Sequence, residues 1–147
     1  NRDGRSRRSG VEAEFDLKLA EDLRLSAQYS LLDASEPGAL SGRLREARRP
    51  RHSGSIALDG TRGRLTYGGL LAYSGARRDT NFDVFPASPV RLGAYWLAGG
   101  RIAYAVSDRL ALFARAANAF DAHYQDVFGY RTEGRSLYGG IRFGAGG

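Results

Sequence analysis

The chain has 147 residues, enough for one domain, and no cysteine, which excludes a disulfide framework and a thiolate metal site. Basic residues outnumber acidic ones by 22 to 16, and nearly all of them are arginine. The arginines cluster in predicted loops and not on a helix or an aromatic platform, so nucleic-acid binding is not expected. The two histidines, His52 and His123, have no partner at metal-ligand spacing, so no metal or cofactor is expected.

The first ten residues are polar and lack the apolar run of a secretory signal. No stretch of the sequence approaches the roughly 18 apolar residues of a membrane-spanning helix. Any membrane-spanning segment must therefore be a strand. We expect the chain to begin in the middle of a longer protein.

Seven segments of period-2 alternation follow one another along the chain. They predict strands near 10–20, 23–33, 51–60, 63–75, 91–106, 109–117 and 135–144. In the first segment the apolar and charged residues separate onto two faces: Val11, Ala13, Phe15, Leu17 and Leu19 against Glu12, Glu14, Asp16 and Lys18. A helix would scatter these charges all round, so a strand is favoured.

The connections between these strands alternate between short and long. Short turns are expected near 21–22, 61–63 and 107–108, and long polar loops near 34–50, 76–90 and 118–133. This alternation is typical of outer-membrane barrels, which have short periplasmic turns and long extracellular loops. The fold class predicted is therefore all-β, an antiparallel up-and-down transmembrane β-barrel segment of about seven strands that ends in the periplasm.

A soluble sandwich or a lipocalin-like barrel would show the same local alternation. Strand length, loop alternation and the outward aromatic residues Tyr29, Tyr73 and Trp96 favour the membrane barrel. Its charged face would then line a wet lumen, with Arg24, Arg101, Arg115 and Arg142 on it. Because single-chain bacterial barrels close with an even strand number, seven strands predict a curved sheet with two open edges.

The segment Asn118-Ala119-Phe120-Asp121, followed by Tyr124 and by Phe128-Gly129-Tyr130-Arg131-Thr132-Glu133-Gly134-Arg135, resembles the final loop of TonB-dependent receptors. The spacing of these residues agrees with the family pattern throughout. The closing stretch from Gly139 to Phe143 resembles the C-terminal signal that outer-membrane proteins present to their assembly machinery, carried by Gly139, Ile141 and Phe143. It departs from that signal because Gly144-Ala145-Gly146-Gly147 follow the aromatic residue.

Within this family the chain most resembles the vitamin B12 (cobalamin) receptor branch. The likeness is carried by Arg48-Arg49-Pro50-Arg51 and by the run Tyr73, Gly75, Arg77, Asp79, Phe82, Phe85, Pro86, Val90, Leu92 and Gly93. It implies that residues 1–147 are the C-terminal part of a receptor barrel without its N-terminal plug. Positions Arg48, Tyr130 and Phe82 correspond to places that contact the ligand in that branch.

The resemblance also implies a location and partners. Receptors of this family sit as multi-pass proteins in the outer membrane of Gram-negative bacteria, with about 22 strands around the plug. They import scarce nutrients with energy from the TonB-ExbB-ExbD complex, which reaches them through the N-terminal region. The expected function is thus uptake of cobalamin or another corrinoid, with a siderophore or haem as the alternative ligand.

Three further hypotheses remain open at the level of sequence. A passive porin-like barrel would have similar strands but no plug. An enzyme would need a nucleophile, a base and an acid together, and His52, Ser53, Asp121 and His123 do not form such a constellation, so no catalytic residue is expected. Finally, Arg43, Arg45, Arg77 and Arg78 could bind the phosphates of lipopolysaccharide.

Overall fold

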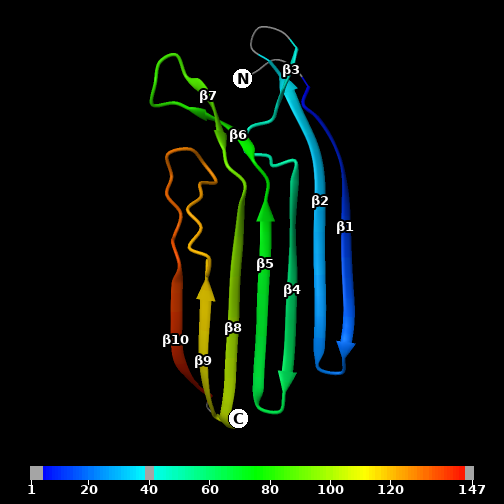
Figure 1. The fold of residues 1–147 in the computed structure, drawn as a ribbon, viewed down its shortest axis with the longest axis vertical. Helices are drawn as coiled ribbons and strands as arrows, with labels where there is room; N and C mark the ends of the chain where they lie inside the picture. The colour runs from blue at the N-terminus through cyan, green and yellow to red at the C-terminus, as the bar shows by residue number, and fades with distance from the viewer. Residues whose placement is uncertain (1–4, 39–41, 145–147) are drawn as a thin grey trace.

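Seven long strands form one antiparallel sheet in the computed structural model, which describes residues 5–38 and 42–144. They are β1 (Arg7–Ala20), β2 (Leu23–Pro37), β4 (His52–Arg62), β5 (Leu65–Ser74), β8 (Tyr95–Ser107), β9 (Leu110–Ala117) and β10 (Ser136–Phe143). The spatial order β1-β2-β4-β5-β8-β9-β10 follows the chain, as Figure 1 shows. The predicted all-β, antiparallel up-and-down architecture is confirmed. Across the described residues, no helix has the length and hydropathy needed to cross a bilayer.

Three short strands lie in the long connections. β3 (Arg43–Arg45) pairs with the end of β2, while β6 (Arg77–Asn81) and β7 (Ser88–Leu92) form a separate hairpin. The region 76–90, predicted as a loop, therefore contains a hairpin, and β7 and β8 share the predicted strand 91–106. The hairpin escaped prediction because β6 is polar throughout, with no alternation to reveal it.

Short and long connections lie at opposite ends of the sheet (Figure 1). Two-residue turns at 21–22, 63–64 and 108–109 join β1 to β2, β4 to β5 and β8 to β9. Gly63 takes a positive φ of 59° in its turn, a conformation that glycine adopts without steric cost. The other end carries β3, the β6–β7 hairpin and the long β9–β10 connection (residues 118–135), and it is the extracellular end in the barrel interpretation.

One face of the sheet is apolar because the register pairs the apolar residues of each strand with those of its neighbours, so that they form rows across the sheet. Tyr29 lies opposite Gly54, Gly54 opposite Tyr73, and Tyr73 opposite Trp96. The rings of Tyr73 and Trp96 pack with centroids 4.7 Å apart. The three aromatic residues expected near strand ends thus form one row, as an interfacial girdle requires.

The apolar face is not covered by another layer of protein. Among residues 5–38 and 42–144, the buried hydrophobic residues are Ala34 and Leu92, whereas Phe15 and Ile56 are each 53% exposed. A soluble sandwich would bury such side chains against a second sheet. An apolar face this wide needs an apolar medium, which lipid supplies.

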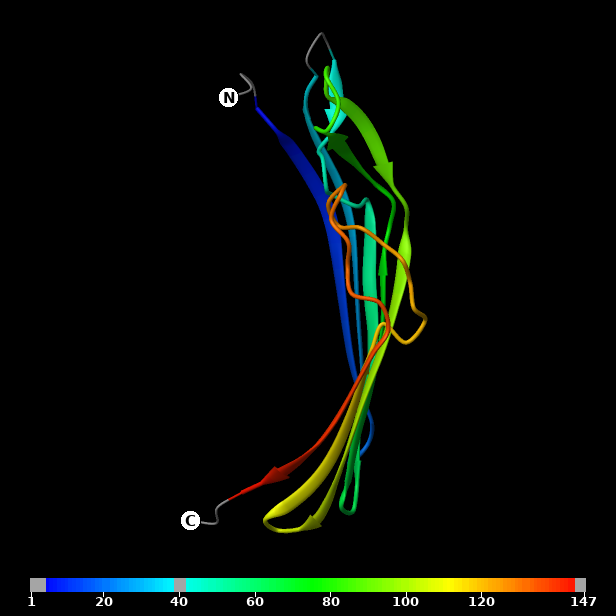
Figure 2. The ribbon, with the colours of Figure 1, turned by 90° about the vertical axis from the view of Figure 1, so that its left-hand side faces the viewer.

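The sheet is bowed and open at both edges. Figure 2 shows the start of β1 and the end of β10 on the same side of the sheet. Within the described residues β1 pairs only with β2, and β10 only with β9. The predicted curved sheet with two open edges is confirmed. The unpaired backbone groups of both edges would be costly in lipid, so the sheet is suited to a larger barrel.

Candidate functional site

The extracellular segments meet at one buried carboxylate, Asp79 of β6. Its Oδ1 accepts hydrogen bonds from Arg48 Nε at 2.9 Å and from the Thr80 backbone N–H at 2.9 Å. Its Oδ2 accepts one from the Phe128 backbone N–H at 2.7 Å. Asp79 therefore joins the β3–β4 connection, the β6–β7 hairpin and the β9–β10 connection.

The environment of Asp79 favours its ionised form. Burial by itself would raise the pKa of this carboxyl, but the hydrogen bonds from Phe128, Thr80 and Arg48 outweigh it and hold the pKa below the usual value. A buried charge is tolerated only when such donors satisfy it. The carboxylate thus stabilises the loop junction only while those three donors stay in place.

Arg77 makes a second junction two residues earlier. Its side chain is 3% exposed and donates to Ser74 Oγ at 2.7 Å, to the Gln125 carbonyl at 2.9 Å and to Asp126. The guanidinium also lies 5.2 Å from the ring centroid of Tyr95. Arg77 is therefore a structural residue, with no donor exposed for lipopolysaccharide.

The hypothesis that loop arginines bind lipopolysaccharide is wrong for Arg77. It is left with three of the four arginines. Arg43 already donates to the Ser35 side chain and to the backbone carbonyls of Ser35 and Arg5, although it stays exposed. Binding of lipopolysaccharide phosphates by Arg43, Arg45 and Arg78 stays a prediction. Periodicity could not have separated these arginines, because burial in a loop depends on contacts with distant segments.

A clasp closes the base of the β9–β10 connection. Asn118 Nδ2 donates to the carbonyls of Ala122 (3.0 Å) and Glu133 (3.2 Å), and its Oδ1 accepts from Ala122 N–H at 2.9 Å. Asp121 Oδ1 accepts from the Arg135 N–H at 2.8 Å, which with its ion pair to Arg135 lowers the pKa of Asp121. Asn118 and Asp121 have φ values of 47° and 54°, which Asn and Asp tolerate better than most residues.

This clasp explains the motif that carried the family resemblance. Asn118, Asp121 and Arg135 hold the two ends of the connection together, and Thr132 Oγ1 donates to the Tyr124 carbonyl at 2.7 Å between them. The motif residues that make these contacts therefore shape the loop. The loop in turn presents Tyr130, whose side chain is exposed.

The three residues expected to contact a ligand belong to the segments that Asp79 joins. Arg48 binds Asp79 directly. Tyr130 follows Phe128 by two residues and is 71% exposed, and Phe82 follows Asp79 by three residues and is 72% exposed. The structure brings the Arg48 and Phe128 segments together at Asp79, and their role in binding stays a prediction. Asp79 itself was missed as a site residue; the available signal was a lone acid beside two arginines.

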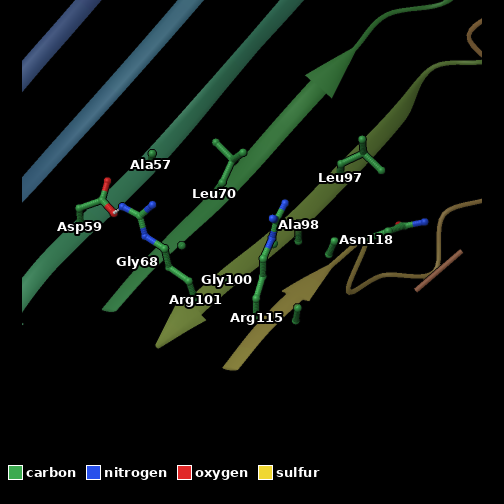
Figure 3. A pocket seen from close by; sticks show the side chains of 14 residues that line it. Ala57, Asp59, Gly68, Leu70, Leu97, Ala98, Gly100, Arg101, Arg115 and Asn118 are labelled. Atoms are coloured by element: carbon green, nitrogen blue, oxygen red, sulfur yellow. Dashed lines mark hydrogen bonds and ion pairs between the residues drawn. The ribbon is translucent and has the colours of Figure 1, made fainter. Parts of the chain in front are cut away.

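The face of the sheet opposite the apolar one carries charges in a row. Arg24 lies opposite Asp59, Asp59 opposite Gly68, Gly68 opposite Arg101, and Arg101 opposite Arg115. Arg101 Nη2 reaches Asp59 Oδ1 at 2.7 Å across the middle strand, as the dashed line in Figure 3 shows. A Cβ on Gly68 would lie 2.3 Å from that oxygen, so glycine leaves the space for the pair.

The C-terminal strand places the expected assembly signal on the open edge. Gly139, Ile141 and Phe143 lie opposite Ala114, Leu112 and Leu110 of β9. Ile141 and Phe143 are exposed on the apolar face. A role of these three residues in assembly stays a prediction.

The open antiparallel sheet, with one apolar face and one charged face, is the architecture of a segment of a membrane barrel. Residues 1–119 match the family described as TonB dependent receptor-like, beta-barrel, so the chain belongs to that family. The family is one of receptors and transporters. Of the residues weighed for an enzyme, His52 has its Nδ1 2.7 Å from the Tyr29 hydroxyl.

Solved structures share the fold. One is the ferripyoverdine receptor of the outer membrane of Pseudomonas aeruginosa bound to ferripyoverdine, at 21% identity and a TM-score of 0.77, covering 94% of this chain and 19% of that one. Another is the siderophore receptor PiuA from Acinetobacter baumannii, at 16% identity and 0.74, covering 94% and 22%. A third is the ferric-catecholate import receptor Fiu from E. coli K12, at 17% identity and 0.77, covering 94% and 21%.

The chain spans about a fifth of the length of each of these proteins. At these identities the likeness is one of fold. The predicted family is confirmed. The cobalamin branch is not supported by these comparisons, since the similar structures named above are of siderophore receptors.

Proposed function

We propose that this chain is the C-terminal part of the barrel of an outer-membrane receptor that takes up a ferric siderophore. The observation that carries the proposal is the loop junction at Asp79. Asp79 binds Arg48, whose two outer guanidinium nitrogens remain able to donate. It also joins the segment of Arg48 to the segments that bear the exposed aromatic residues Tyr130 and Phe82. Arginine donors bind anionic oxygens, and aromatic rings pack on flat ligand groups.

The charge of the extracellular segments supports an anionic ligand. Arginines outnumber acidic residues there, the arginines being Arg43, Arg45, Arg48, Arg49, Arg51, Arg77, Arg78, Arg91, Arg131 and Arg135. Siderophores bind iron through anionic oxygen donors, and their ferric complexes often retain negative charge. Such a surface steers anions toward the site and speeds their association. The similar siderophore receptors add support at the level of fold.

A corrinoid is the second candidate ligand, and haem is a third. The corrinoid is favoured by the resemblance of Arg48-Arg49-Pro50-Arg51 and Tyr130 to the cobalamin branch. Arg48 could donate to the phosphate or amide oxygens of a corrinoid, and Tyr130 could pack on its macrocycle. A passive porin-like barrel is less favoured, since a pore needs no fixed loop junction.

The remaining parts of the proposal concern the rest of the receptor. Import would depend on a plug and on the TonB-ExbB-ExbD complex, engaged through the N-terminal region of the receptor. Insertion would depend on the outer-membrane assembly machinery, which would recognise Gly139, Ile141 and Phe143. The location is the outer membrane of a Gram-negative bacterium, crossed many times by strands.

Binding to the intact receptor tests the ligand class. Outer-membrane vesicles that contain it would be titrated with ferric pyoverdine, ferric enterobactin, haemin and cyanocobalamin. We expect saturable binding of a ferric siderophore and a Kd raised about tenfold by Arg48→Gln, the loss of one charged hydrogen-bond donor. Saturable binding of cyanocobalamin alone would replace the siderophore with a corrinoid.

A further inference from the structure

The contact with Asp79 uses only part of the Arg48 guanidinium. Asp79 Oδ1 accepts from Nε at 2.9 Å. Within residues 5–38 and 42–144, Nη1 and Nη2 of Arg48 have no hydrogen-bond or ion-pair partner. The Arg48 side chain is 47% exposed, whereas that of Asp79 is 1% exposed. The buried acid thus holds the guanidinium by its inner nitrogen and leaves its two outer nitrogens free to donate.

The backbone of Arg48 is also held in an unusual conformation. Its φ of 60° lies in the left-handed region, which glycine or asparagine adopts at lower cost. The Arg48 N–H donates to the Arg78 carbonyl at 2.7 Å, which fixes this conformation against the β6–β7 hairpin. Strained residues that are not glycine cluster at ligand clamps and active sites. An arginine at this position therefore indicates a role for its side chain.

We propose that Asp79 is a positioning residue for ligand binding. It fixes the guanidinium of Arg48 so that Nη1 and Nη2 together receive two oxygen atoms of an anionic ligand. The inference rests on the proposed function, since it names how the same site recognises its ligand. Carboxylate, hydroxamate and catecholate groups each offer a pair of neighbouring oxygens, which suits the planar fork of a guanidinium.

Charge alone predicts the opposite effect of Asp79. Its negative charge beside Arg48 lowers the positive potential that attracts an anion. If attraction alone mattered, removal of that charge would tighten binding. If Asp79 orients Arg48, its removal weakens binding, because the ligand must then order a mobile side chain. The sign of the effect therefore separates a positioning role from a passive ion pair.

A double-mutant cycle in the intact receptor provides the test, with ferric pyoverdine and ferric enterobactin as probes. Asp79→Asn is expected to raise the Kd of the bound probe about tenfold. In an Arg48→Lys background, which lacks the fork, Asp79→Asn is expected to raise Kd by clearly less than in the wild type, since only its contacts with Phe128 and Thr80 are then lost. Asp59→Asn is the matched control: it removes an equal charge and breaks an arginine ion pair, that with Arg101, without touching Arg48 or the loops, and Kd should stay within about twofold.

Two results would overturn the positioning role and leave the proposed function standing. One is unchanged or tighter binding by Asp79→Asn, and the other is full additivity with Arg48→Lys. Heat-modifiable migration on gels shows whether each variant folds. If Asp79→Asn does not accumulate, probe binding by Arg48→Lys alone tests the inference, because this variant keeps the positive charge and loses the planar fork of donors. Unchanged probe binding by Arg48→Lys then overturns the inference.

If neither probe binds, the proposed ligand class is wrong. The positioning role of Asp79 can then still be tested by a measurement that needs no ligand. The Arg48 Nε–H resonance of the receptor is followed by NMR. We expect slow hydrogen exchange in the wild type and in Asp59→Asn, and fast exchange in Asp79→Asn. Fast exchange in the wild type would show that Asp79 does not hold Arg48.

Discussion

Leu70 and Leu71 of β5 provide a direct test of which face of the sheet meets lipid. They are neighbours with the same side chain, but they point to opposite faces. Leu71 lies opposite Ile56 and Ala98 on the apolar face, and Leu70 lies opposite Ala57 and Gly99 on the charged face. The substitutions Leu71→Arg and Leu70→Arg therefore place one charge in two different media.

The position of Leu71 sets the magnitude. At about 3.3 Å per residue, it lies about 7 Å along the strand from Tyr73 in the aromatic row and about 13 Å from Tyr67. This is near mid-depth, where arginine on the lipid face costs about 2–4 kcal/mol. That cost lowers the folding equilibrium constant by about 30-fold to 900-fold. Leu70→Arg faces water and should cost about 1 kcal/mol or less, as ordinary surface substitutions do.

Urea titration of the intact receptor refolded into liposomes measures both costs, with heat-modifiable migration as the readout. Leu70→Ala and Leu71→Ala serve as matched controls for the lost leucine packing. Equal costs for the two arginine variants, or a larger cost for Leu70→Arg, would refute the assignment of the apolar face to lipid.

Three further predictions follow from single contacts. Asn118→Ala removes three hydrogen bonds from the β9–β10 clasp and should loosen that connection by about 2–3 kcal/mol, seen as faster trypsin cleavage on intact cells; an unchanged rate would contradict the clasp. Because the pKa of Asp79 is lowered in the fold, its stabilisation is complete above the unfolded value of about 3.9 and is lost as pH falls through the lower folded value. The protection factor of the Phe128 N–H, which allows for the pH dependence of intrinsic exchange, should then fall only below about pH 4, and a fall near pH 6 would argue against the carboxylate. Gly68→Ala should separate Asp59 from Arg101 yet cost only about 1 kcal/mol or less in urea titration, since the pair is solvated; a loss of several kcal/mol would show that the pair is structural.

Much of the seven-stranded sheet could be predicted, because the alternation of apolar and polar residues along each strand defines its two faces. The alternation of Val11, Phe15 and Leu17 with Glu12 and Glu14 needs no knowledge of distant residues. The polar loops and tight turns marked where the chain reverses. The open edges followed from the odd number of strands, since a single-chain bacterial barrel closes with an even number.

The loop junctions could not be predicted, because their residues are close in space and distant in sequence. Asp79 meets Arg48 and Phe128 across separations of 31 and 49 residues. Arg77, which the sequence could only describe as one of several loop arginines, is buried by Asp126 and Tyr95. The sequence by itself determined the strands and their faces, because alternation is local. Only the tertiary structure decided which charges are buried, paired or left free at the extracellular end, because burial depends on segments that meet after folding.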